Sequence, residues 1–277
     1  MSTTQTLLLG AIAGFTIFLG LPVGRMEMRS KGLRAGLTAF SAGILVFLLW
    51  DVLGHGVEPV ESAVEAHHWG RVAQLGPLLG VGLGLGFLGL VYYDRWMTNK
   101  RSTPLVGPGA AAVDEFDSRG WIERLTPGQR LALLIATGIG LHNFGEGLAI
   151  GQAAAADELS LALVLIIGFA LHNATEGFGI VGPLSGESVK PGWGFLGLMG
   201  LIGGGPTFVG TLIGQAWVSE ALSVAFFAVA AGSILYVVLQ LVEVCRRYSM
   251  PVVVAWWLFA GLVVGFATDF ILVAAGA

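Results

Sequence analysis

Eight apolar runs divide this chain, and each is long enough to cross a lipid bilayer as a helix. A membrane-spanning helix needs about 20 apolar residues. With 55% hydrophobic and 12% charged residues, the 277-residue chain is too apolar for a soluble domain of its size. We therefore predict an all-α polytopic membrane protein that forms a single transmembrane domain, residues 1–277. The predicted spans are residues 4–24, 34–54, 76–93, 131–151, 159–181, 194–216, 221–244 and 251–275.

Basic residues predict how these spans are oriented. With eight spans, Arg71 is the only one of the 14 Lys and Arg residues that falls on its side of the membrane. The other side is cytoplasmic by the positive-inside rule, so both termini lie outside. The outer connections carry acidic residues instead, which either concentrate cations at the mouth of a site or simply solvate helix ends. These acidic residues are Glu58, Glu61, Glu65, Asp157, Glu158 and Glu220.

One long connection, residues 94–130, joins the third and fourth spans and is predicted to be cytoplasmic. Its VGPGAAA segment, residues 106–112, is typical of a flexible linker, and we expect a short membrane-surface helix near Trp121.

Two sequence repeats suggest internal symmetry. LHNFGEGLAI at residues 141–150 is repeated thirty residues later as LHNATEGFGI at residues 171–180. A fainter repeat relates residues 39–53 to residues 228–242, with Asp51 opposite Gln240. Both pairs fall on spans that run in opposite directions, as expected for halves related by a two-fold axis in the membrane plane. We predict three spans, a central pair, and three spans in an inverted-repeat arrangement.

The first repeat places polar side chains at the middle of the two central spans. Residues four apart share one face of a helix, so His142 lies above Glu146 and His172 above Glu176. Two imidazoles and two carboxylates at one depth suit a divalent ion such as Zn²⁺, whose charge the carboxylates neutralise. The other interpretation, hydrogen bonding between helices with a protonated Glu, explains one copy as well but not the duplication.

The neighbouring Asn143 and Asn173 lie about 100° round from their histidines and face the same interhelical space. Glycines on both sides of Glu146, and after Glu176, either loosen the helix toward a cavity or allow close helix packing.

Two other uses of buried histidines fit the sequence less well. A membrane-embedded zinc hydrolase needs an asymmetric site with an open position for water, and the chain has no HExxH motif. A haem protein with His142 and His172 as axial ligands leaves Glu146 and Glu176 unexplained. The single Cys245 argues against a thiolate metal site.

The doubled motif, HNFGEG at residues 142–147 and HNATEG at residues 172–177, resembles that of the ZIP family of divalent metal transporters. The resemblance covers the whole chain through its eight spans and outside termini. It implies a homodimeric uptake carrier, not an enzyme, that works by alternating access, with spans one, four, five and six moving against the other four. The implied metal-site residues are His142, Asn143, Glu146, His172, Asn173 and Glu176.

This chain departs from the family pattern at three places. Gly145 and Thr175 replace the prolines of the family motif, and Gly205 stands where the sixth span commonly carries a glutamate that helps to bind a second metal. Because Gly205 and Asn173 are both neutral, a two-metal centre would lose charge on two sides, and we predict one metal ion rather than two. No histidine-rich cytoplasmic loop is present in the sequence.

Further polar residues suggest a path for the ion. Asp51 and His55 near the outer end of the second span, with Asp269 in the eighth, form a possible entrance, or are helix-end charges. Glu243 is a possible exit, although a salt bridge to Arg246 or Arg247 is the favoured reading.

The expected cargo is a divalent ion, most simply Zn²⁺, with Cd²⁺, Mn²⁺, Fe²⁺ or Co²⁺ also compatible. No prosthetic group is expected. The expected location is the inner or plasma membrane. The expected partners are the ion, the lipid bilayer and a second copy, with no nucleic acid.

Overall fold

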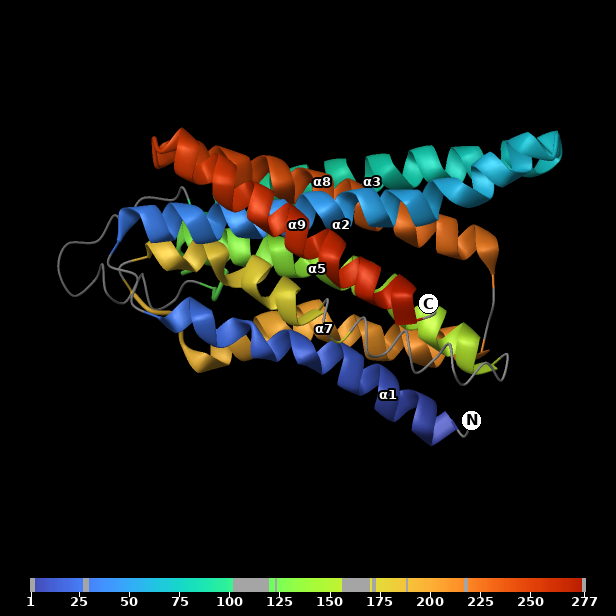
Figure 1. Cartoon of the computed structure of the whole chain (residues 1–277), viewed down its shortest axis with the longest axis horizontal. Coiled ribbons are helices and arrows are strands. Elements are labelled where there is room, and N and C mark those ends of the chain that lie inside the picture. Colours follow the sequence, from blue (N-terminus) through green and yellow to red (C-terminus); the bar gives the residue numbers. More distant parts are fainter. Residues whose placement is uncertain are drawn as a thin grey trace.

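The computed structural model is a bundle of long helices (Figure 1). It describes residues 3–26, 30–101, 120–122, 124–155, 170, 173–187, 189–216 and 219–275, and the described residues contain no β-strand. The long helices are α1 (Thr3–Phe15), α2 (Lys31–Glu65), α3 (Trp69–Arg101), α5 (Pro127–Ala155), α7 (Trp193–Ala216), α8 (Glu220–Arg247) and α9 (Pro251–Ala275). Residues 173–181 are also helical and lead into a short 3₁₀ helix, η3 (Gly182–Gly186). Two further 3₁₀ helices, η1 (Thr16–Leu19) and η2 (Leu21–Arg25), follow α1.

Seven segments are long and apolar enough to span a membrane, and they coincide with seven of the eight predicted spans. The remaining predicted span, the fifth along the chain at residues 159–181, falls largely outside the described residues, and only its end is seen as helix 173–181. The start of α1 and the end of α9 lie at the same end of the bundle (Figure 1), which agrees with an even number of spans. The chain is an all-α polytopic membrane protein, as predicted.

The predicted outer end carries one basic residue near the start of α3, Arg71, and the fold neutralises it. Its guanidinium group forms an ion pair with Glu220 at the start of α8, with an N–O distance of 2.5 Å. The end that is rich in Lys and Arg lies opposite, where α2, α5 and α9 begin (Figure 1).

Glycines bring the backbones of particular helices into direct contact. Gly147 and Gly210 let α5 and α7 touch, because a side chain on either would strike a carbonyl oxygen of the other helix. Gly14 and Gly204 do the same for α1 and α7, and Gly177 does so for helix 173–181 against η1. A second set of contacts joins α2 to α9 and α3 to α8. These contacts join α1, α5, α7 and helix 173–181, and they form two pairs, α2 with α9 and α3 with α8. Because α2 also packs on α8, the two pairs make up a second group.

The contacts within the second group follow the predicted inverted repeat. Gly43 of α2 packs on α9, and its repeat partner Gly232 of α8 packs on α3. The Phe40 carbonyl faces Gly261, just as the carbonyl at its repeat partner, Val229, faces Gly86. Aligned residues thus make equivalent contacts with exchanged partner helices, as a two-fold related pair requires.

Several element boundaries differ from the sequence prediction. α2 and α3 extend to Glu65 and from Trp69, so Asp51 and His55 lie well inside α2 rather than near its end. The long connection is shorter at both ends, because α3 continues to Arg101 and α5 begins at Pro127. The expected surface helix near Trp121 is wrong for the described residues, since Trp121 and Ile122 form a turn; residues 102–119 lie outside the described residues.

Candidate metal-binding site

The central helix α5, which carries His142, Asn143 and Glu146, begins at a reciprocal cap that fixes its first turn. Gln129 N donates to Thr126 Oγ1 at 3.1 Å, and Thr126 N donates to Gln129 Oε1 at 2.9 Å. Gly128 N donates to Glu187 Oε1 at 2.8 Å, which satisfies another free amide of the first turn. From this cap the helix runs without interruption through Gly145 and Gly147, so these glycines serve packing rather than local unwinding.

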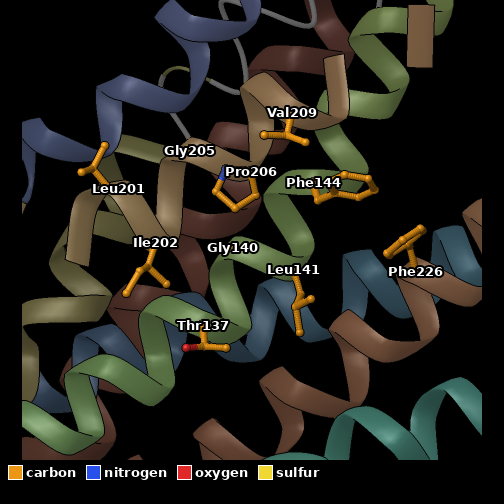
Figure 2. A pocket seen from close by; sticks show the side chains of 10 residues that line it. All are labelled: Thr137, Gly140, Leu141, Phe144, Leu201, Ile202, Gly205, Pro206, Val209 and Phe226. Carbon is orange, nitrogen blue, oxygen red and sulfur yellow. The ribbon is translucent and has the colours of Figure 1, made fainter. Parts of the chain in front are cut away.

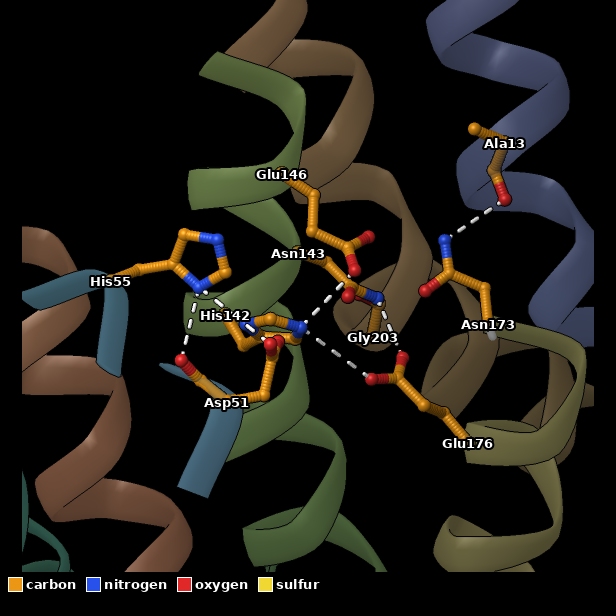
Figure 3. A network of polar contacts seen from close by, with 9 residues as sticks. All are labelled: Ala13, Asp51, His55, His142, Asn143, Glu146, Asn173, Glu176 and Gly203. Atoms are coloured by element: carbon orange, nitrogen blue, oxygen red, sulfur yellow. Dashed lines mark hydrogen bonds and ion pairs between the residues drawn. The ribbon is translucent and has the colours of Figure 1, made fainter. Parts of the chain in front are cut away.

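His142 lies between two buried carboxylates (Figure 3). Its Nε2 atom is 3.1 Å from Glu146 Oε1, one turn further along α5, and 4.0 Å from Glu176 Oε1 of helix 173–181. All three side chains are at most 5% exposed. The predicted meeting of the two central spans at one depth is therefore present in the structure for these residues.

The two asparagines anchor the site to neighbouring helices (Figure 3). Asn143 Nδ2 donates to Glu176 Oε2 and to the carbonyl of Gly203 in α7, both at 3.0 Å. Asn173 Nδ2 donates to the carbonyl of Ala13 in α1 at 3.0 Å. Asn143 thus holds one carboxylate in place, and both amides are fully buried.

Asp51 and His55 approach this cluster from α2 (Figure 3). His55 Nδ1 lies 3.0 Å from the backbone oxygen of Asp51 and 3.7 Å from its Oδ1 atom. The Asp51 charge is close enough to act on His142 and on Asp269 of α9. The His55 side chain is 57% exposed and that of Asp51 22%, so the predicted entrance residues lie between the buried cluster and the surface.

The donor set fits a divalent metal ion in chemistry, and one of its two separations also fits in spacing. Zn²⁺ with ligands at about 2.0–2.2 Å in a tetrahedron separates neighbouring donors by roughly 3.3 Å. The distance from His142 Nε2 to Glu146 Oε1, 3.1 Å, is close to that value, whereas the distance from His142 Nε2 to Glu176 Oε1, 4.0 Å, is longer. Three buried oxygens at the cluster make no hydrogen bond among the described residues, namely Asn143 Oδ1, Glu146 Oε2 and Asn173 Oδ1. Buried oxygens of this kind need a partner, and a cation supplies one.

The described side chains do not by themselves complete a ligand set. Within the described residues, no three His, Cys, Asp or Glu side chains are arranged to hold a metal ion. The fourth predicted ligand, His172, lies outside the described residues.

Gly205 faces away from the cluster. It lines a pocket of about 580 Å³ between α5, α7 and α8 whose other walls include Leu141, Phe144, Pro206 and Phe226 (Figure 2). The pocket is almost entirely apolar, and a Cβ added at Gly205 would meet nothing within 4 Å. No charged side chain lines the pocket at this point of α7.

Glu243, the predicted exit residue, lies apart from the cluster. It is exposed near the end of α8, and its Oε1 is 3.5 Å from Arg247 Nε. The favoured reading of a salt bridge to Arg246 or Arg247 is confirmed for Arg247.

Some contributors to the site were not predicted. The carbonyls of Ala13 and Gly203 accept hydrogen bonds from Asn173 and Asn143, but they belong to the backbone, so the residue type does not reveal this role. Phe227 of α8 stacks on His55, with 5.5 Å between ring centroids, and touches α5 at Gly145; an aromatic residue in an apolar run gives no hint of this position.

Comparison with known protein families identifies the family of this chain. A comparison with curated proteins gave no match. The family model described as ZIP zinc transporter matches residues 117–268, which is more than half of the chain and includes both copies of the His-Asn motif. The chain therefore belongs to the ZIP family of metal transporters.

Proposed function

We propose that this chain carries Zn²⁺ across the cell membrane through one ion site formed by His142, Glu146, His172 and Glu176, with Asn143 and Asn173 beside it. Membership in the ZIP family makes the chain a divalent metal transporter rather than an enzyme, so the hydrolase alternative is set aside. The observation that carries the proposal is the buried imidazole nitrogen of His142, 3.1 and 4.0 Å from two carboxylates. Nitrogen and oxygen donors suit Zn²⁺, and two carboxylates balance its charge in a low-dielectric interior.

A single ion is favoured by the charges around the site. Asn143 and Asn173 are neutral, and Gly205 faces an apolar pocket. A second divalent ion beside the first would share the same two buried carboxylates, so half of its charge would be uncompensated.

The ion is proposed to enter from the predicted outer face past Asp51, His55 and Asp269. The exposure of His55 supports access from that side. Leu48, Ile139 and Ile180 are fully buried and lie three or four residues from Asp51, His142 and Glu176 toward the predicted cytoplasmic end, and they are proposed to close the path on that side. Glu243 remains a candidate exit residue, and its ion pair with Arg247 would have to open as the ion leaves.

Alternating access is proposed to occur by movement of one helix group against the other. We call α1, α5, 173–181 and α7 the transport unit, and α2, α3, α8 and α9 the scaffold unit. Among the described glycines, every close contact with another helix backbone falls within one unit, as at Gly147 and Gly43. Backbone contacts of this kind hold helices at fixed separation, so each unit is suited to move as a rigid body. A homodimer is proposed from family membership alone.

The test is uptake by proteoliposomes that contain a zinc-sensitive dye. Wild-type vesicles should fill when external Zn²⁺ is added, whereas His172→Ala and Glu176→Gln should slow the initial rate at least about tenfold, the effect of losing one strong metal contact. Glu65→Gln is the matched control, because it removes an exposed carboxylate that lies 14 residues along α2 from Asp51, outside the cluster and outside the proposed entrance and exit. If Glu176→Gln fills as fast as wild type, Glu176 is not a transport ligand and the proposed site is wrong.

Proton competition gives the proposal a pH dependence. The imidazole of His142 and the two carboxylates bind metal only when deprotonated. Uptake from a more acidic medium should therefore be slower at the same Zn²⁺ concentration. Initial rates that rise as the external pH falls would contradict this donor set.

A further inference from the structure

With η3 counted in the transport unit, because it directly continues helix 173–181, only two described glycines closely meet a side chain across the boundary between the transport and scaffold units. A Cβ on Gly145 of α5 would lie 2.7 Å from Phe227 Cε1 of α8, and a Cβ on Gly182 would lie 2.6 Å from Ser41 Oγ of α2. With contacts this short, a side chain at the glycine fits only if the facing side chain shifts. The boundary is thus closely packed at these two points, and one of them adjoins Glu146.

Phe227 bridges three helices at the level of the metal site. Its ring stacks on His55 of α2, with 5.5 Å between centroids and 29° between planes. Its Cβ is 3.4 Å from the position of a Cβ on Gly56, and its ring edge fills the space beside α5 that Gly145 leaves. One ring therefore fixes the distance between the helix that carries Asp51 and the helix that carries His142 and Glu146.

We propose that Phe227 is a positioning residue for ion binding, and that the missing side chain of Gly145 leaves the space that its ring occupies. This inference rests on the proposed function, because it assumes that His142 and Glu146 receive the ion from Asp51 and His55. While the Phe227 ring packs against Gly145, α5 is held in the register that places its His142 and Glu146 beside Asp51 and His55 of α2 (Figure 3). Any sliding of the transport unit moves Gly145 away from Phe227, so the contact stabilises the ion-accepting arrangement only.

The consequence is a change in apparent affinity. When the binding-competent arrangement is populated only in a fraction of molecules, the apparent dissociation constant rises by the inverse of that fraction. Phe227→Ala removes the ring, and Gly145→Ala displaces it. Each should therefore raise the Zn²⁺ concentration for half-maximal uptake, by about three- to tenfold if the contact couples as neighbouring residues usually do. The maximal rate per folded molecule should change by less than about twofold, because no metal ligand is altered.

The two substitutions should also be coupled. The three atoms nearest to a Cβ at position 145 all belong to the Phe227 ring, so Gly145→Ala should have no further effect in the Phe227→Ala background. Phe226→Ala is the matched control. Phe226 is the same residue type one position earlier, but it packs on Phe144, at 4.5 Å between centroids, and lines the apolar pocket (Figure 2). The effect of Gly145→Ala should persist in full in the Phe226→Ala background.

The experiment measures Zn²⁺ uptake by proteoliposomes and, on the same purified proteins, the rise in melting temperature with Zn²⁺ concentration. The second measurement reports binding without transport, because a ligand that binds the folded state stabilises it by mass action. The expected result is a higher half-saturating Zn²⁺ concentration in both assays for the single variants, with no additivity in the double variant. Unchanged half-saturation, or additive effects, overturns the proposal and leaves Phe227 a packing residue.

The two assays separate this inference from the proposed function. If wild-type protein binds Zn²⁺ but does not transport it, the proposed function fails, whereas the role of Phe227 is still decided by the melting curves. If wild-type protein neither binds nor transports Zn²⁺, both are wrong.

Discussion

Asn143 allows the strength of the site's internal hydrogen bonds to be measured. Its amide donates to Glu176 Oε2 and to the Gly203 carbonyl at 3.0 Å each, and every atom involved is buried. Asn143→Ala removes the donor from Glu176 Oε2, whereas the Gly203 carbonyl, inside α7, keeps its intrahelical hydrogen bond. Losing the partner of one buried acceptor costs about 1–3 kcal/mol, so we expect a loss of about 1–3 kcal/mol in free energy of unfolding, toward the lower end if water enters the space.

The measurement is equilibrium unfolding in detergent micelles, followed by far-ultraviolet circular dichroism, without added metal. Thr137→Ala is a matched control on the same helix, because the Thr137 hydroxyl donates only to the Leu133 carbonyl within α5, at 2.8 Å. That variant should lose less than about 1 kcal/mol. If Asn143→Ala is within about 0.5 kcal/mol of wild type, the two hydrogen bonds do not hold the site and the reasoning is refuted.

Asn143→Asp adds a second test of the same contact. The substitution replaces a donor by a carboxylate directly against Glu176, so it should destabilise the metal-free protein at least as much as Asn143→Ala. Zn²⁺ should reverse part of this loss in the Asp variant and not in the Ala variant, because a cation neutralises the added charge. If Zn²⁺ stabilises both variants equally, the charge at position 143 does not affect Zn²⁺ binding, and the ion does not bind next to this residue.

Further predictions concern packing. Gly210→Ala should destabilise the protein by about 1–3 kcal/mol, because its methyl group would strike the Phe144 carbonyl, whereas Gly205→Ala on the same helix meets open space and should be neutral or slightly stabilising in the same unfolding assay. Equal effects of these two alanines would contradict the α5–α7 packing. Cys245 is 3% exposed, so a maleimide should label it slowly in the native protein and fully after denaturation, as judged by mass spectrometry; rapid native labelling would place it on the surface.

Much of the site could be predicted from the sequence, because the doubled motif fixes both spacing and depth. The four-residue separation of His142 and Glu146 requires a shared helix face, and the repeat on an antiparallel span brings Glu176 to the same level. The inverted repeat was also readable, since Gly43 and Gly232 align in sequence and make equivalent contacts. Periodic charge and small-residue patterns survive in a membrane helix because substitution there is costly.

Other features could not be predicted, for identifiable reasons. Backbone carbonyls such as those of Ala13 and Gly203 bind the asparagines, and a carbonyl is present at every residue. Phe227 is one of 16 phenylalanines, and only the packing of three helices distinguishes it. The predicted spans for α2 and α3 were too short because an apolar run measures the part of a helix that lies in lipid, not the part beyond it.

The length of α2 has a consequence for how metal ions reach the protein. Its 35 residues span about 52 Å, far more than the roughly 30 Å hydrocarbon core, and its far end projects with the start of α3 beyond the rest of the bundle (Figure 1). Glu65 at that tip is 14 residues, or about 21 Å, along the helix from Asp51. This is more than two Debye lengths at physiological ionic strength, where the screening distance is about 8 Å. The acidic tip therefore attracts cations to itself without guiding them to Asp51, and it becomes part of the capture surface only in dilute media, where the screening distance reaches about 30 Å.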